Sequence, residues 1–465
     1  MDKEKPIFAV VGQPNKGKSS VVATLARLSD VEISARSGTT KKSDPFDVMS
    51  NNEVLYRLYD TPGFQRARQV ISWMQAQKPN ASERALTVKK FIEYAKQSDQ
   101  FLDERELLDP ILNINTQDET TSTGIIYVVD GSIPFHSSIE SELEILQWTG
   151  QPRMALINPI ESDQYVDQWT NALGQYFSIV RVFNPVNASF DEQMQLLDGF
   201  MQLEGCWQAG LNHAKTQLIN EKQNLLEMSA HHITLMIESI LRLQLKAPLL
   251  HESMMDTEKT VLLASFKKQV IGLESQCFAK LALLFKHHIQ IKSDQIQIDS
   301  QKLFDKEQWF LWGLNPNQIV KYSALTGFTV GAAVDLSVGG ASFLLGALSG
   351  GFIGGAGSLA TMKFSDKWLK DIHLNGENLV AGPINNQAFM FALLGRSVSY
   401  IKTINQRNHA NQNGTVEVSA VKWSDQLNSK KMIELTKLLK TLSKRDFKIS
   451  EQQKMQSIIL ELLKD

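Results

Sequence analysis

Cysteine is scarce in this sequence: Cys206 and Cys277 are the only two among 465 residues. Two cysteines cannot build a disulfide framework or a cysteine zinc site, and this composition fits a reducing compartment. An excess of charge is also missing, because 48 Lys and Arg face 50 Asp and Glu, for a net charge of −2. We therefore do not expect the overall charge of the protein to favour binding to nucleic acid. Residues 1–6 lead straight into an apolar run, so we expect no signal peptide.

The most informative stretch runs from Gly12 to Ser19 and reads G-Q-P-N-K-G-K-S, which fits the phosphate-loop pattern G-x-x-x-x-G-K-[ST]. A short apolar run at residues 7–11 predicts a buried strand before it, and residues 20–28 have helical spacing after it. This context suits anion binding, because backbone N–H groups and the helix N-terminus face the phosphates. We expect Lys18 to reach the β- and γ-phosphates and the Ser19 hydroxyl to ligate Mg²⁺.

A second signature, D-T-P-G, occupies Asp60 to Gly63. Two apolar runs at residues 46–49 and 54–59 precede it, and Asn51-Asn52 between them predicts a β-hairpin. At the end of a strand and downstream of a phosphate loop, Asp60 can hold the Mg²⁺ shell and the Gly63 N–H can sense the γ-phosphate.

Strand and helix patterns alternate over residues 6–204, which predicts an α/β doubly wound sheet in a domain covering residues 1–204. Residues 124–130 read as a central parallel strand, and residues 154–157 and 180–183 predict two further strands. Residues 65–123 are too long for a simple connection. Helical patterns at 65–75 and 82–106 make this insertion a lid, a partner surface or a passive elaboration.

These residues carry a family resemblance. The set G-Q-P-N-K-G-K-S, S-G-T-T at residues 37–40 and D-T-P-G-F at residues 60–64 resembles the translation-factor class of P-loop GTPases, with a Ras-like fold, nearest the Era and TrmE branch. The resemblance implies GTP and GDP as ligands and Mg²⁺ as cofactor. It implies Thr40, or alternatively Thr39, as the switch residue that meets Mg²⁺ and the γ-phosphate.

The same resemblance implies a potassium ion at Asn15, in place of an arginine finger; the alternative is that Asn15 only shapes the turn. Position 64 is Phe, whose ring cannot orient an attacking water. We therefore expect slow intrinsic hydrolysis that needs potassium or a partner.

The base-reading motif of the family is N-K-x-D, whereas this sequence has N-P-I-E at Asn158 to Glu161. Glu161 can accept the same guanine hydrogen bonds but reaches one bond further. Residues 187–189, Asn-Ala-Ser, stand where the family has S-A-K. The choice between GTP and ATP stays open at this point. The residues expected at the nucleotide are Gly12, Asn15, Lys16, Gly17, Lys18, Ser19, Ser20, Asp60, Gly63, Asn158 and Glu161, with Lys18, Thr40 and Asn15 in catalytic roles and Ser19, Thr40 and Asp60 as Mg²⁺ ligands.

Strand signals stop after Gly205, and long helical patterns at 208–246 and 254–292 predict a helical stalk or bundle over residues 205–322. His231-His232 and His287-His288 are adjacent pairs on these helices. Neighbouring helical side chains point about 100° apart, so we do not expect either pair to chelate a metal.

Residues 323–364 are apolar and rich in glycine, and Asp335 is the only charge between 326 and 362. Glycines at four-residue steps favour two closely packed helices, either as a hairpin inserted in the inner membrane or as a buried pair within the protein. Residues 365–465 are expected to form an α-rich domain. In it, residues 389–403 are a strand or a helix, and 429–464 an amphipathic helix with clustered lysines.

The whole arrangement resembles a bacterial subgroup of Era-like GTPases with an uncharacterised C-terminal domain. Three hypotheses follow: a GTPase switch coupled to a membrane or an unknown protein partner, a pseudo-GTPase scaffold, and a membrane-remodelling or pore-forming GTPase. A GTP-dependent dimer of the GTPase domain is a further expectation, as is a cytoplasmic location with or without inner-membrane association. No specific nucleic acid is expected as a partner.

Overall fold

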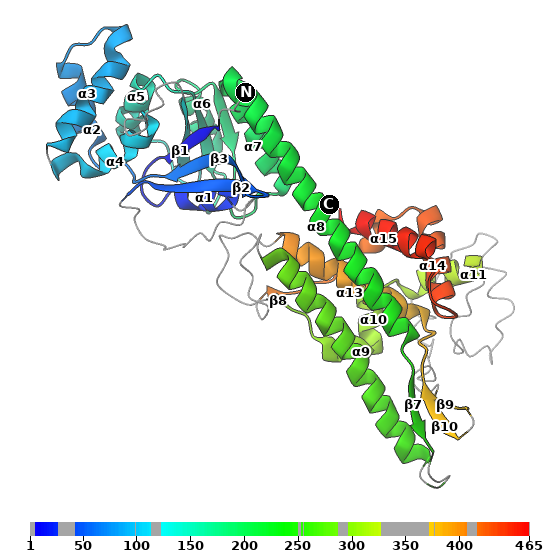
Figure 1. Cartoon of the computed structure of the whole chain (residues 1–465). Coiled ribbons are helices and arrows are strands. Elements are labelled where there is room, and N and C mark those ends of the chain that lie inside the picture. The colour runs from blue at the N-terminus through cyan, green and yellow to red at the C-terminus, as the bar shows by residue number, and fades with distance from the viewer. Residues whose placement is uncertain are drawn as a thin grey trace. The chain divides into compact units, whose positions relative to one another are not determined.

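The computed structural model of the chain describes residues 5–26, 42–97, 99–112, 122–249, 253, 255–286, 296–326, 372–375, 377–406 and 416–464 (Figure 1). They form two compact units. The first contains the described residues up to Gln223, and the second contains most of those from Asn224 onward. The chain passes from the first unit to the second within helix α8 (Gln208–Arg242).

Within the described residues of the first unit, six strands form one sheet in the order β2-β3-β1-β4-β5-β6. All neighbouring pairs are parallel except β2 and β3, which form an antiparallel hairpin. Asn51 and Asn52 turn this hairpin with φ values of 48° and 65°. The predicted α/β sheet, its hairpin and its central strand are confirmed. The strands are β1 (Ile7–Val11), β2 (Asp44–Ser50), β3 (Glu53–Asp60), β4 (Thr123–Asp130), β5 (Arg153–Asn158) and β6 (Ile179–Val182).

Helices cover both faces of this sheet, as a doubly wound fold requires (Figure 1). Along β1, Phe8 and Val10 point into one core, while Ala9 and Val11 point into the other. The first core is closed by α1 (Lys18–Ala26), α7 (Phe190–Leu203) and the start of α8. The second is closed by α2 (Ala67–Ala76), α3 (Arg84–Lys96), α4 (Leu102–Ile111), α5 (Glu140–Trp148) and α6 (Val166–Leu173).

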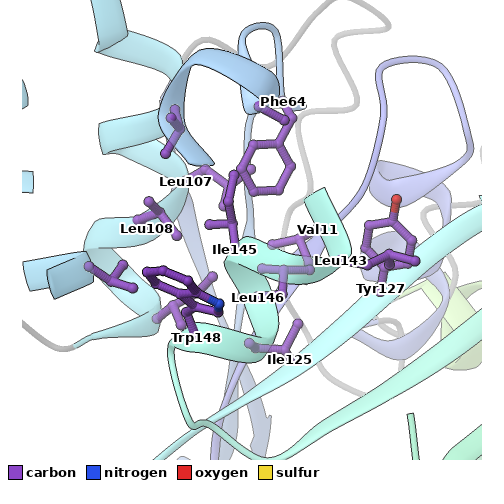
Figure 2. Packing of buried hydrophobic residues seen from close by; sticks show 14 of the residues in the cluster. Val11, Phe64, Leu107, Leu108, Ile125, Tyr127, Leu143, Ile145, Leu146 and Trp148 are labelled. Atoms are coloured by element: carbon purple, nitrogen blue, oxygen red, sulfur yellow. The ribbon is translucent and has the colours of Figure 1, made fainter. Parts of the chain in front are cut away.

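The insertion after D-T-P-G contributes directly to the second core. Val88, Phe91 and Ile92 are buried in it, whereas Tyr94 of the same helix is 42% exposed. The prediction of one helical stretch at 82–106 is wrong, because α3 ends at Lys96 and α4 begins at Leu102 after a short 3-10 turn at Asp99–Phe101. Figure 2 shows Phe64 in this cluster together with residues of α4 and α5.

The second unit is mainly helical, but the prediction that strands stop after Gly205 is wrong. Within its described residues, β7 (Leu245–Pro248), β10 (Asn378–Ala381) and β9 (Ile372–Asn375) form an antiparallel sheet in that order, and β8 (Ile296–Gln297) pairs with β11 (Val416–Glu417). The helix predicted to reach residue 246 ends at Arg242. The remaining helices are α9 (Met255–Lys286), α10 (Lys306–Trp312), α11 (Pro316–Thr326), α13 (Gln387–Gln406), α14 (Ser429–Leu442) and α15 (Ile449–Leu463).

The segment predicted as one amphipathic helix at 429–464 is two helices, α14 and α15. The second starts afresh at Ile449, where the Glu451 carboxylate accepts a hydrogen bond from the Lys448 backbone N–H at 2.9 Å. Residues 389–403, which the sequence left as strand or helix, are helical and belong to α13.

The predicted glycine-rich hairpin lies outside the described residues, because the description stops at Thr326 and resumes at residue 372. His287-His288 and Asp335 lie outside it as well. Among the helices that the structure describes, none is both long and apolar enough to cross a membrane.

A buried ion pair joins α9 and α13 in the second unit. Arg396 donates to both oxygens of Glu274 at 2.7 and 3.0 Å, and the two side chains are almost fully buried. The guanidinium also lies 5.5 Å from the centre of the Trp312 ring. Beside it, Gly395 lets α13 approach the end of α10, where the Trp312 carbonyl accepts from Trp423 Nε1 at 2.9 Å.

Two glycines in this unit should respond oppositely to alanine. A Cβ on Gly395 would lie 1.7 Å from the Trp312 oxygen, so Gly395→Ala should lower the free energy of unfolding by about 3 kcal/mol or more. Gly272 in α9 has nothing within 4 Å of such a Cβ, and Gly272→Ala should raise it by about 0.5–1 kcal/mol, because alanine is the better helix former. Urea denaturation of both variants checks this; equal effects would contradict the close approach of α13 to α10.

Candidate functional site

The loop between β1 and α1 is held in a conformation that depends on glycine. Gly12 and Gly17 have φ values of 141° and 91°, where side chains are strained. A Cβ on Gly12 would lie 2.3 Å from the Val128 oxygen, and one on Gly17 would lie 2.4 Å from Asn158 Nδ2. The loop main chain is therefore packed against the ends of β4 and β5. Between these glycines, Asn15 is exposed and also has a positive φ of 62°.

The D-T-P-G segment lies directly against this loop. A Cβ on Gly63 would come within 2.6 Å of Pro14 Cδ, so the two signatures touch. The Thr61 hydroxyl donates to the Val10 carbonyl at 2.8 Å, which fixes the segment to the end of β1. Sequence positions that are far apart thus form one surface at the carboxyl ends of the parallel strands.

Ser19 and Asp60 meet in this surface, where the Ser19 hydroxyl donates to Asp60 Oδ2 at 2.6 Å. A hydroxyl and a carboxylate oxygen side by side are the hard ligands that Mg²⁺ takes. The residues present therefore fit a magnesium ion. Ser20 follows in the first turn of α1 and is half-buried. The switch candidates Thr39 and Thr40 lie outside the described residues.

Two lysines of the loop are held differently. Lys16 lies 3.4 Å from Asp130 Oδ2 at the end of β4. Lys18 is buried and donates to the Gln13 carbonyl at 3.0 Å, across the loop. Burial lowers the pKa of Lys18, and the charges of Asp60 and Glu142 act in the opposite direction. A partly desolvated ammonium group in a loop at a helix N-terminus is suited to an anionic ligand.

The residues expected at the base are divided between two environments. Asn158, at the end of β5, is buried, and its amide donates to the Lys16 carbonyl at 3.3 Å, so it supports the phosphate loop. Glu161 is exposed in the segment that follows β5. In the loop at residues 187–189, Ala188 is buried and Ser189 caps α7 by accepting a hydrogen bond from the Glu192 N–H at 3.2 Å.

Sequence reasoning missed two buried carboxylates next to these segments. Glu142 on α5 accepts from Gln13 Nε2 at 3.1 Å and from the Tyr127 hydroxyl at 2.8 Å. Burial raises the pKa of Glu142 to about 7, against the opposing effect of those hydrogen bonds and of Lys18. Glu104 on α4 accepts from the Gln65 N–H at 3.0 Å.

The same Glu104 oxygen also accepts from the Arg66 N–H at 2.5 Å. Arg66 stands at the N-terminus of α2, where its own side chain makes no capping hydrogen bond. The insertion therefore supplies, from α4, the carboxylate that caps α2 and fixes the residues after D-T-P-G-F.

A shared signal could have found both carboxylates. Glu104 stands between Phe101 and Leu108 at helical spacing, and Glu142 stands likewise between Ile139 and Leu146. An acidic residue inside an apolar stripe predicts a buried carboxylate with dedicated partners.

Comparison with known families decides the relationship of the chain. The family model that is described as a domain of unknown function (DUF3482) matches residues 170–464, more than half of the sequence. The chain belongs to this family. A second model, described as a 50S ribosome-binding GTPase, matches residues 7–158, which contain the phosphate loop and the D-T-P-G segment. Together with the sheet order and the loop geometry, this match makes the N-terminal unit of this DUF3482 protein a P-loop GTPase domain.

Two curated relatives are also GTPases. The chain is 25% identical over 175 residues to the GTPase Der of Paraburkholderia phymatum, covering 38% of this chain and 30% of the relative. It is also 25% identical over 175 residues to the GTPase Der of Geotalea daltonii, covering 38% of this chain and 31% of that relative. The chain thus spans less than a third of the length of either relative.

The carboxylate cap should be measurable. Glu104→Ala removes the acceptor of two backbone N–H groups and should lower the free energy of unfolding by about 2 kcal/mol. Amide hydrogen exchange at residues 65 and 66 should become faster than in the wild type. Asp103→Ala, in the same turn but only half-buried, is the matched control and should leave that exchange unchanged. Unaltered exchange in Glu104→Ala would show that α4 does not hold this segment.

Proposed function

We propose that this protein is a GTP-binding nucleotide switch that hydrolyses GTP slowly, related to the Era and TrmE branch of the P-loop GTPases. The observation that carries the proposal is the junction of the two signatures. Gly63 packs on Pro14, and Ser19 bonds to Asp60, so phosphate-holding and γ-phosphate-sensing segments form one site. The GTPase family match and the two Der relatives support guanine as the base.

In this proposal the backbone N–H groups from Gly12 to Gly17 hold the phosphates, and the Lys18 ammonium reaches toward the β- and γ-phosphates. Ser19 and Asp60, with Thr40, would hold Mg²⁺, which supplies neutralisation of the phosphate charge. The Gly63 N–H would bond the γ-phosphate, so that its loss on hydrolysis releases the D-T-P-G segment.

Glu161 is exposed, so its side chain could reach a guanine base from solvent. Asn158 holds the phosphate loop in place through its hydrogen bond to the Lys16 carbonyl. Glu161 would accept the N1–H and amino hydrogen bonds of guanine. Lys16 and Ser20 border the phosphates at either side of Gly17 to Ser19.

Slow hydrolysis follows from Phe64. Its ring is only 5% exposed and packs in the core that the insertion shares with the sheet (Figure 2). The side chain after D-T-P-G therefore lies in apolar surroundings and offers no polar group that could orient an attacking water. Potassium at the exposed Asn15, or a protein partner, would have to supply the missing stabilisation. The region matched by the DUF3482 model would transmit the nucleotide state to a protein or membrane partner.

Calorimetry with Mg²⁺ and GTP, GDP or ATP tests binding. The wild type should bind GTP and GDP, with ATP at least about tenfold weaker. Lys18→Ala should weaken GTP binding by about 100-fold, because it removes the charged hydrogen-bond donor for the phosphates. Lys89→Ala removes an exposed lysine of α3 and serves as the control with unchanged affinity. Full GTP affinity in Lys18→Ala would refute the assigned site.

Single-turnover hydrolysis in potassium and in sodium tests catalysis. The wild type should hydrolyse GTP faster in potassium, by about tenfold or more, and Asn15→Ala should remove that difference. Equal rates in both salts would exclude the potassium role. GTP binding without hydrolysis under either condition would instead indicate a pseudo-GTPase scaffold, which the buried Phe64 also fits.

A further inference from the structure

Glu142 occupies an unusual place for a carboxylate. It lies on the buried face of α5, only 3% exposed, where a leucine or alanine would satisfy the apolar stripe. Each of its oxygens has one donor: Gln13 Nε2 at 3.1 Å and the Tyr127 hydroxyl at 2.8 Å. Burying a charged group costs free energy unless its partners compensate, so its presence here needs a local reason.

The reason lies in what Gln13 does. The Gln13 side chain is held by Glu142, and the Gln13 carbonyl accepts from the Lys18 ammonium at 3.0 Å. A continuous path of hydrogen bonds thus runs from α5 through the second residue of the phosphate loop to its lysine. Moving Glu142 would move Gln13, and with it the carbonyl that orients Lys18.

The charge of Glu142 is finely balanced. Burial raises its pKa to about 7, while the hydrogen bonds from Tyr127 and Gln13 and the charge of Lys18 lower it. The ionisable groups that act on it are Lys18 at the start of α1 and Tyr127 on β4. Burial, together with Glu142, raises the pKa of Tyr127, which therefore stays a hydrogen-bond donor at neutral pH.

We propose that Glu142 is a positioning residue of the phosphate loop, and that it takes up a proton when a nucleoside triphosphate enters the loop. The proposal rests on the nucleotide-binding function proposed above. A triphosphate brings several negative charges close to Lys18, and a nearby carboxylate then becomes harder to keep ionised. Protonated Glu142 can still accept from Gln13, so the loop keeps its anchor.

The direction of the pH effect follows from linkage. Below pH 7, Glu142 is already mostly protonated and does not oppose the ligand. As the pH rises through 7, the free protein holds an ionised carboxylate that must take up a proton or repel the phosphates, so affinity falls. The wild type should bind a non-hydrolysable GTP analogue with Mg²⁺ about fivefold more weakly at pH 8.5 than at pH 6.5, after correction for the titration of the ligand itself.

Glu142→Gln supplies that correction and the main test. A glutamine keeps an acceptor for Gln13 and can donate to the Tyr127 oxygen, but it does not titrate. After the same correction for the ligand, the affinity of Glu142→Gln should not change between pH 6.5 and 8.5. At pH 8.5 it should be about fivefold higher than the affinity of the wild type. Glu142→Ala lacks both acceptors and should bind the analogue about tenfold more weakly than Glu142→Gln at every pH. The glutamine variant therefore recovers the affinity that the alanine variant loses. Glu140→Gln, which removes an exposed charge from the same turn of α5, should behave as the wild type.

A count of protons taken up on binding completes the design. Calorimetry at pH 7.5 in two buffers of different ionisation enthalpy counts protons, and we expect uptake of about half a proton per analogue bound, absent in Glu142→Gln. No uptake in the wild type, or the same pH profile in wild type and Glu142→Gln, would overturn the proposal even if GTP binds well. A wild type that binds no GTP at any pH would instead remove the proposed function itself.

Discussion

The close approach of glycine main chain to neighbouring strands and loops at the carboxyl end of the first sheet is the constraint on which the GTPase site depends. Gly12, Gly17 and Gly63 each stand where a Cβ would collide with a neighbouring strand end or loop. Because these contacts leave no room for side chains, the backbone amides of the loop are brought to one surface rather than spread over the molecule. The Ser19–Asp60 hydrogen bond is a result of that approach.

Buried carboxylates hold the segments around this constraint, and the same device recurs in both units. Glu104 accepts from two backbone N–H groups, Glu142 accepts from Gln13 and Tyr127, and Glu274 pairs with Arg396. A buried carboxylate without donors is strongly unfavourable, so each of these residues fixes its partners in one arrangement. In the first unit the partners are the two loops that would contact a nucleotide, and in the second they are helices α9 and α13.

The sequence made the first unit predictable because its signals are long or chemically specific. The apolar run at β4 and the Asn51-Asn52 turn give strands directly, and the glycine spacing of the phosphate loop requires the turn that Gly12 and Gly17 make. The described strands of the second unit were missed because they have four residues or fewer, which is too short for an alternating pattern to stand out; β9 is almost wholly exposed. The apolar stripe around Glu142 could have indicated its burial, but its partners could not be predicted, because Gln13 and Tyr127 lie on a loop and a strand that only the folded sheet brings together.

The burial of Phe64 changes how the helical insertion should be regarded. The ring lies immediately after the glycine that would read the γ-phosphate, and it belongs to the same buried cluster as Leu107 and Leu108 of α4 (Figure 2). Trimming α2 to α4 to obtain a minimal GTPase domain would uncover an aromatic side chain beside the D-T-P-G segment. The insertion therefore packs directly against the segment that, in the proposed function, would respond to hydrolysis.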